Sequence, residues 1–183
     1  MMTVSFYRRK LPHWQPESGS IFLTWRLFGS LPKGFAERLR RWSNDPGKQF
    51  VDADRMLDAA SQGPFWLKDP QIAGHARCAI QRGAELGHYV LRAWAIMPNH
   101  VHVLLDPLVP LARLTLGIKR ASAKDANATL GRTGKPFWQD ESFDRWVRGP
   151  AEFARIHAYI ENNPVKARLC ARPQDWPWSS AHK

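Results

Sequence analysis

The sequence predicts an α+β protein of the ferredoxin-like sandwich kind, with helices on the face of a mostly antiparallel sheet. Strand-like and helix-like segments are intermixed along the chain, in the order strand, helix, strand, strand, helix, short strand, helix. The extended runs YVLRAWAIMP (89–98) and HVHVLLDP (100–107) are joined across Pro98-Asn99, which is typical of an antiparallel pair. Neither a repeat nor a low-complexity segment interrupts residues 1–183, so we expect a single domain.

Local signals predict the other elements. The run IFLTWRLF (21–28) is rich in β-branched and aromatic residues, as strands are. A helix is expected between Asp69 and Gly87, because Asp69 suits the N-cap, Pro70 the first helical position and Gly87 the stop. The same kinds of signal predict helices over 34–42, about 52–60, about 111–130 and 151–163, the last stopped by Pro164, and a partly extended stretch over 136–148.

Two segments stand apart from this pattern. The N-terminal arm, residues 1–18, carries the cations Arg8, Arg9 and Lys10 before any periodic pattern begins. Residues of about 33–66 contain the turn signals SNDPG and SQGP around a helix. We therefore interpret them as a helical insertion within the domain.

The charge balance indicates a polyanionic partner. Lys and Arg number 27 against 16 Asp and Glu, so the net charge is +11, and such a surface commonly binds nucleic acid. A solvated basic surface without function is the alternative. Cys78 and Cys170 lie far apart and form no CxxC, which argues against a disulfide framework or a zinc ribbon. No signal-peptide run or membrane-length apolar run is apparent, so we expect a cytoplasmic protein without a membrane partner.

His100 and His102 are unusual in an apolar strand. Alternation places both side chains, with Leu104, on one face, about 7 Å apart along the strand. Two neutral imidazoles on one face can hold a divalent ion, although a half-exposed pair at a sheet rim is the commoner arrangement. A histidine-triad hydrolase would need a third histidine where Leu104 stands. A zinc deaminase would need HxE and a later PCxxC, and both are missing.

The last predicted helix supplies further polar candidates. Tyr159 and Asn163 are an i, i+4 pair on one strip at the margin of the apolar face. They are either a boundary tyrosine and a C-terminal asparagine, or a nucleophile and an amide ligand that both approach the histidine face.

With these motifs the chain resembles the REP-associated tyrosine transposases, relatives of the single-tyrosine HUH transposases of bacterial insertion sequences. MPNHVHVLL followed by YIENNPVKA carries the resemblance, supported by FWLKDPQIA, FWQDESFDRWVR and DWPWSS in family order. HUH denotes histidine, bulky hydrophobic residue, histidine, here 100–102. The resemblance implies the HUH endonuclease type of the α+β fold. It also implies a bacterial protein associated with the nucleoid.

The resemblance also implies roles for individual residues. His100, His102 and Asn163 would bind Mg²⁺ or Mn²⁺, and Tyr159 would be the nucleophile. The substrate would be single-stranded or hairpin DNA of the REP palindrome type, bound by a monomer or a homodimer. The chain departs from the family pattern at Arg168, where NPVKAGL commonly has a glycine. The cations that we expect to bind phosphates of the DNA are Arg8, Arg9, Lys10, Lys119, Arg120 and Lys124.

Three functions remain open on the sequence. The first is a strand transferase that forms a 5′-phosphotyrosine and can rejoin strands. The second is a catalytically silent DNA- or RNA-binding regulator on the same fold. The third is a metal-dependent phosphoesterase that uses activated water. The first requires a base for Tyr159, whose ordinary pKa is near 10, and Lys166 is near it in sequence.

Overall fold

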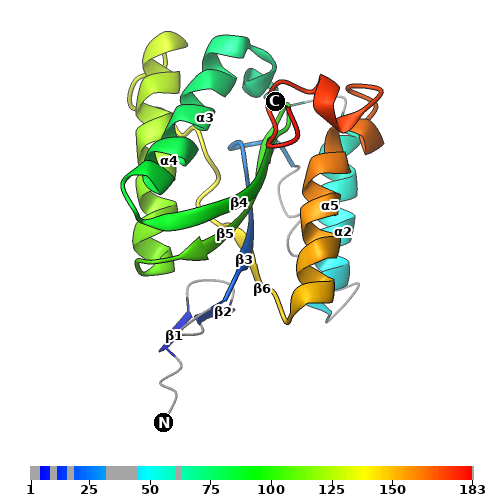
Figure 1. Ribbon diagram of the computed structural model, residues 1–183. Coiled ribbons are helices and arrows are strands. Elements are labelled where there is room, and N and C mark those ends of the chain that lie inside the picture. The colour runs from blue at the N-terminus through cyan, green and yellow to red at the C-terminus, as the bar shows by residue number, and fades with distance from the viewer. Residues whose placement is uncertain (1–4, 9–11, 16–18, 32–44, 61–62, 183) are drawn as a thin grey trace.

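The central sheet has four antiparallel strands in the order β4-β5-β3-β6 (Figure 1). The computed structural model describes residues 5–8, 12–15, 19–31, 45–60 and 63–182. Taken in chain order, the strands and the helices between them follow the β-α-β-β-α-β pattern of a ferredoxin-like sandwich, which confirms the predicted fold class. The strands are β3 (Ile21–Arg26), β4 (Tyr89–Ile96), β5 (His100–Pro107) and β6 (Phe143–Trp146).

Helices cover both faces of this sheet. Figure 1 shows α3 and α4 on one side and α2 and α5 on the other. None of the helices in the described ranges combines the length and the apolarity that a membrane crossing requires. The helices are α2 (Pro46–Asp58), α3 (Pro70–Glu85), α4 (Leu111–Thr129) and α5 (Pro150–Lys166), with short 3-10 turns η1 (Trp66–Lys68) and η2 (Pro173–Asp175).

Alternation along β5 separates a wholly apolar face from the face that carries the histidines. Val101, Val103 and Leu105 are fully buried in the larger core, which α3 and α4 complete. Leu104 points the other way, into a smaller apolar cluster with Ile160 of α5. His100 and His102 share that second face, as the period of two predicts. The histidines therefore lie between the sheet and the α2–α5 layer.

The C-terminal tail covers the outer edge of β4. The backbone N–H of Ile96 donates to Trp178 O at 2.8 Å, and that of Ser180 donates to Trp94 O at 2.9 Å. The Trp176 indole also donates to Ile96 O. An edge strand with free backbone groups would be open to pairing with another chain, and here the tail satisfies the backbone groups of Trp94 and Ile96.

Several segments differ from the prediction in their bounds. The helix expected over 52–60 is α2, which begins earlier, at Pro46. Two short paired strands, β1 (Ser5–Arg8) and β2 (Pro12–Gln15), occur in the segment expected to be a basic arm. The helix expected over 34–42 lies outside the described residues.

Pro164 does not end the last helix, contrary to the sequence-based expectation. α5 continues to Lys166 and closes with a Schellman motif, in which Arg168 N–H donates to Val165 O at 2.9 Å and Leu169 N–H to Pro164 O at 2.8 Å. A proline in the last turn removes the one hydrogen bond that its own N–H would donate, and α5 continues for two residues beyond it. Arg168 occupies the left-handed position of the motif, with φ of 59°.

This left-handed arginine gives a stability prediction. A residue with a Cβ costs about 1–2 kcal/mol at positive φ. Glycine removes this cost, but its larger unfolded-state entropy cancels part of the gain in stability. We expect Arg168→Gly to raise the free energy of unfolding by about 0.5–1 kcal/mol in urea denaturation. Arg168→Ala, which keeps the Cβ, serves as the matched control and should leave it unchanged. Equal stabilities for the two variants would contradict the strain argument.

Candidate functional site

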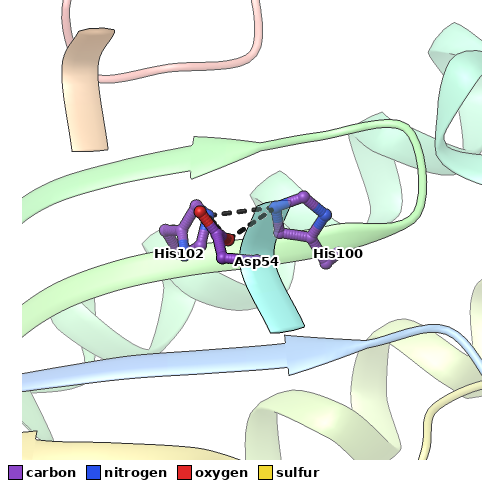
Figure 2. A group of neighbouring side chains, drawn as sticks. All are labelled: Asp54, His100 and His102. Atoms are coloured by element: carbon purple, nitrogen blue, oxygen red, sulfur yellow. Dashed lines mark hydrogen bonds and ion pairs between the residues drawn. The ribbon is translucent and has the colours of Figure 1, made fainter. Parts of the chain in front are cut away.

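His100 and His102 converge on one buried point (Figure 2). Their Nε2 atoms are 3.0 Å apart, and both residues have 0% exposure. The Nδ1 atom of His100 lies 2.6 Å from Asn99 Oδ1, and that of His102 lies 2.7 Å from Thr24 Oγ1 on the paired strand β3. These contacts turn both rings so that Nε2 faces inward, as second-sphere hydrogen bonds do for metal-binding histidines.

The protonation of His100 follows from its partners. The carboxamide oxygen of Asn99 only accepts, so the Nδ1 of His100 carries the hydrogen. Burial and the neighbouring charge of His102 lower the pKa of His100 to about 3, so its ring is neutral near pH 7. The Nε2 of His100 therefore presents a lone pair, which is the form that binds a metal.

Asp54 of α2 brings a carboxylate to the same point. Its Oδ1 lies 3.1 Å from His102 Nε2 and 3.5 Å from His100 Nε2, and the residue is 1% exposed. Burial alone would raise the pKa of Asp54. The charge of His102 and its hydrogen bond, with smaller contributions from His100 and Tyr159, outweigh burial and hold that pKa below its usual range. Asp54 is thus an ionised carboxylate in a buried site.

Asn163 of α5 completes the cluster. Its Nδ2 lies 3.0 Å from His102 Nε2 and 3.5 Å from Asp54 Oδ2, and the residue is fully buried. Its Oδ1 is buried without a hydrogen-bond partner. The two amide atoms are distinguished only by their hydrogen bonds, and half a turn of the amide exchanges them. The exchange would satisfy Oδ1 if a cation lay beside the histidine nitrogens.

This donor set fits a divalent cation. Asp54, His100 and His102 can each place one ligand atom within 4.8 Å of the others. Ligand atoms about 2.1 Å from an octahedral ion lie about 3 Å from each other, which matches the spacing of the two imidazole nitrogens and one carboxylate oxygen. Imidazole with carboxylate and amide oxygen suits manganese and also accommodates magnesium.

Tyr159 lies beside this cluster, one helical turn before Asn163. Its hydroxyl donates to Asp54 Oδ2, and its ring centroid is 5.8 Å from that of His102. Phe22 and Phe50 pack edge-on against the Tyr159 ring at 6.1 and 6.3 Å. Burial, followed by the charge and hydrogen bond of Asp54, raises the pKa of Tyr159 above its ordinary value. The phenol is therefore protonated and held by its acceptor.

A second α2 carboxylate, Asp58, lies at the rim of the cluster. Its Oδ1 is 4.0 Å from His100 Nε2, and both carboxylate oxygens are buried without a hydrogen bond. Burial and the charge of Asp54 raise the pKa of Asp58 to about 6, against a smaller lowering by Lys166. Two acidic side chains from one helix therefore face the histidine pair.

The structure brings the four main predicted residues, His100, His102, Tyr159 and Asn163, together. It does not bring the helical cations to them, because α4 covers the opposite face of the sheet. Arg120 and Lys124 are exposed there, whereas the ammonium of Lys119 donates to Gln139 O at 2.8 Å and Asp140 O at 3.0 Å. Arg9 and Lys10 lie outside the described residues, and Arg8 is the last residue of β1.

Asp54 and Asp58 are not among the residues that the sequence patterns predict for the site. At 100° per residue, Asp54 falls on the same side of α2 as the apolar Phe50 and Leu57, and Asp58 lies one turn further on. Carboxylates that lie on or beside an apolar helical stripe are a signal of a polar site under that helix. Asn99, which the sequence places only at the junction of two strands, orients His100 and donates to Leu57 O at 2.9 Å.

Comparison with known proteins identifies the family. The family model described as "Transposase IS200 like" matches residues 66–163, just over half of the chain. The chain belongs to the IS200-like transposase family. The matched segment of this IS200-like transposase includes both histidines, Tyr159 and Asn163. It begins after α2 ends, so Asp54 and Asp58 lie outside it.

The chain is also similar to two REP-associated tyrosine transposases. A REP-associated tyrosine transposase of Escherichia coli (strain K12) is 25% identical over 114 residues, which are 62% of this chain and 65% of that protein, slightly less than two thirds. A solved structure of a REP-associated tyrosine transposase bound to a REP hairpin superposes with a TM-score of 0.60 at 19% identity, over 97% of this chain and 83% of that one. At that identity the superposition supports the fold.

The site geometry predicts that metal binding stabilises the protein. At a Mn²⁺ concentration about 100 times the dissociation constant, binding adds about 2.7 kcal/mol, which for this size raises Tm by about 5–10 °C. We expect this shift in wild type and in His75→Ala, whose side chain lies on the other layer. It should vanish in the His100→Ala/His102→Ala double variant and shrink in Asp54→Asn. A shift that persists in the double variant would place the ion elsewhere.

Proposed function

We propose that this chain is a metal-dependent single-stranded DNA endonuclease and strand transferase with Tyr159 as its nucleophile. The observation that carries the proposal is the position of one carboxylate. Asp54 Oδ2 accepts a hydrogen bond from the Tyr159 hydroxyl, and Asp54 Oδ1 faces the Nε2 atoms of both histidines. The Asp54 carboxylate therefore lies between the proposed nucleophile and the metal-binding nitrogens. A phosphodiester bound beside this carboxylate would contact both the Tyr159 hydroxyl and the metal ion.

Each residue has a distinct part in this proposal. His100, His102 and Asn163, together with Asp54, would hold Mg²⁺ or Mn²⁺. The bound ion would polarise the phosphoryl group and offset its charge. Asn99 and Thr24 keep the imidazoles turned inward. The aromatic side chains around Tyr159 restrict its ring, so that the hydroxyl keeps one direction of approach.

The reaction exchanges one phosphodiester for another. The Tyr159 oxygen forms a bond to phosphorus, the bond from phosphorus to the 3′ oxygen breaks, and the phenol proton ends on the released 3′ hydroxyl. The protein then carries a 5′-phosphotyrosine. Because the new bond is also a phosphodiester, a 3′ hydroxyl can reverse the step and rejoin strands without ATP.

The proposed substrate is hairpin DNA of the REP type with an unpaired flank. The net charge of +11 favours a nucleic acid partner. The similarity to REP-associated tyrosine transposases, one of them solved on a REP hairpin, supports that class of DNA. Arg8, Arg9, Lys10, Arg120 and Lys124 remain proposed phosphate contacts, whereas Lys119 already donates to two carbonyls. Within this chain Tyr159 lies beside His102.

A covalent adduct is the direct test. Hairpin oligonucleotides from beside the gene, labelled at the 3′ end, are incubated with protein and Mn²⁺ and separated on a denaturing gel. We expect a labelled protein band from wild type, because the 5′-phosphotyrosine retains the fragment with the 3′ end. Tyr159→Phe should give none, and His100→Ala should lose it as well. Tyr89→Phe, which alters a tyrosine packed against α3, is the matched control and should retain it.

Each alternative function has its own outcome in this assay. An adduct that persists in Tyr159→Phe would overturn the nucleophile assignment, and cleavage that survives that change would indicate activated water. DNA binding that persists in EDTA, with no adduct for any metal or hairpin, would identify a silent binding protein instead.

A further inference from the structure

Lys166 is a third polar side chain in line with Tyr159 and Asn163 on α5. It lies seven residues after Tyr159 and three after Asn163, so the three share one side of the helix. This alignment exists only because α5 continues through Pro164. The ammonium of Lys166 is 5.2 Å from the centroid of the Tyr159 ring.

Two carboxylates of α2 hold this ammonium from the other side. Lys166 Nζ is 3.8 Å from Asp54 Oδ2 and 3.7 Å from Asp58 Oδ2. Both distances exceed those of direct hydrogen bonds, so the ion pairs are loose. Asp54 Oδ2 also accepts a hydrogen bond from the Tyr159 hydroxyl. The same carboxylate oxygen therefore lies next to both the ammonium of Lys166 and the oxygen proposed to react.

Lys166 lies where the buried site meets solvent. Its side chain is 51% exposed, whereas those of His100 and His102 are 1% and 0% exposed. The site residues form a gradient from buried metal ligands, through the partly exposed Tyr159, to this ammonium. A phosphodiester that approaches Tyr159 from solvent would meet Lys166 on its way to the metal ligands.

We propose that Lys166 binds a non-bridging oxygen of the phosphodiester that Tyr159 attacks, and that Asp58 positions the ammonium for this contact. This inference rests on the proposed function. During attack the Oη–P bond forms, the P–O3′ bond breaks, and the phenol proton ends on the 3′ hydroxyl. The ammonium neutralises charge on the phosphoryl oxygens throughout and transfers no proton. Rejoining passes through the same arrangement in reverse, so Lys166 assists both directions.

Loss of Lys166 should have different effects if the ammonium binds the phosphoryl group than if it only stabilises the fold through ion pairs. The loss of one preorganised donor to a transition state typically slows the chemical step about 100-fold or more. The loss of one phosphate contact among several weakens DNA binding only slightly and lowers its salt dependence by about one ion. A merely structural lysine would instead affect folding and metal binding.

Single-turnover adduct formation with Mn²⁺ and hairpin DNA tests this. We expect Lys166→Met to slow the adduct rate about 100-fold, while the Mn²⁺-induced Tm shift stays at the wild-type value and DNA affinity changes by less than about threefold. Lys166→Arg, which keeps the charge, should recover most of the rate. Asp58→Asn should reduce the rate about tenfold, since a loosely held ammonium still reaches the phosphate. Lys135→Met, in an exposed turn after α4, is the matched control.

The outcomes separate this inference from the proposed function. If wild type forms the adduct and Lys166→Met matches its rate, the role of Lys166 is wrong and the nucleophile assignment stands. If Lys166→Met and Lys166→Arg both lose the rate together with the Mn²⁺-induced shift, the lysine is structural, and the inference is likewise overturned. If wild type forms no adduct with any hairpin, both proposals fail.

Discussion

The convergence of lone pairs on one buried point is the constraint on which the rest of this site depends. Two imidazole nitrogens 3.0 Å apart and a carboxylate oxygen 3.1 Å from one of them repel unless a proton or a cation lies between them. In a buried site this repulsion is weakly screened, and an unpaired charge is costly. The surrounding contacts, from Thr24 and Asn99 behind the rings to Asn163 in front, keep these groups from relaxing apart.

The sheet can hold such a cluster because its two faces differ in composition. The α3–α4 face buries a large apolar core that includes alternate residues of β3 and β5. The α2–α5 face has a much smaller apolar cluster, built around Phe22, Leu104 and Ile160. Stability is therefore supplied mainly on the side away from the polar site. Substitutions on the α2–α5 face can consequently change the polar site without removing most of the core.

The sequence predicted the parts of this site that follow from short-range periodicity. A period of two on β5 placed His100 and His102 on one face, and a period of 3.6 aligned Tyr159 with Asn163. It did not predict Asp54, because no local rule states which face of the sheet a helix in an insertion will cover. Only the tertiary position of α2 brings that carboxylate within 3.1 Å of His102.

The end of α5 is a second place where a local sequence rule does not predict the structure. A proline is a sound local reason to end a helix, yet α5 continues past Pro164 and closes with the Schellman motif around Arg168. The additional turn decides which residues share a face with Tyr159. Without it, Lys166 would belong to a loop and its alignment with Asn163 would be lost. The sequence places Lys166 near Tyr159, but only the continuation of α5 puts both side chains on one side of the same helix.

The position of α2 extends the site beyond what family membership describes. The family match includes the histidines and the tyrosine but not the helix whose carboxylate contacts both. Burial and the negative charge of Asp54 together raise the pKa of Tyr159, because both disfavour the phenolate. The same carboxylate faces both histidine Nε2 atoms, so α2 links the phenol to the histidine pair.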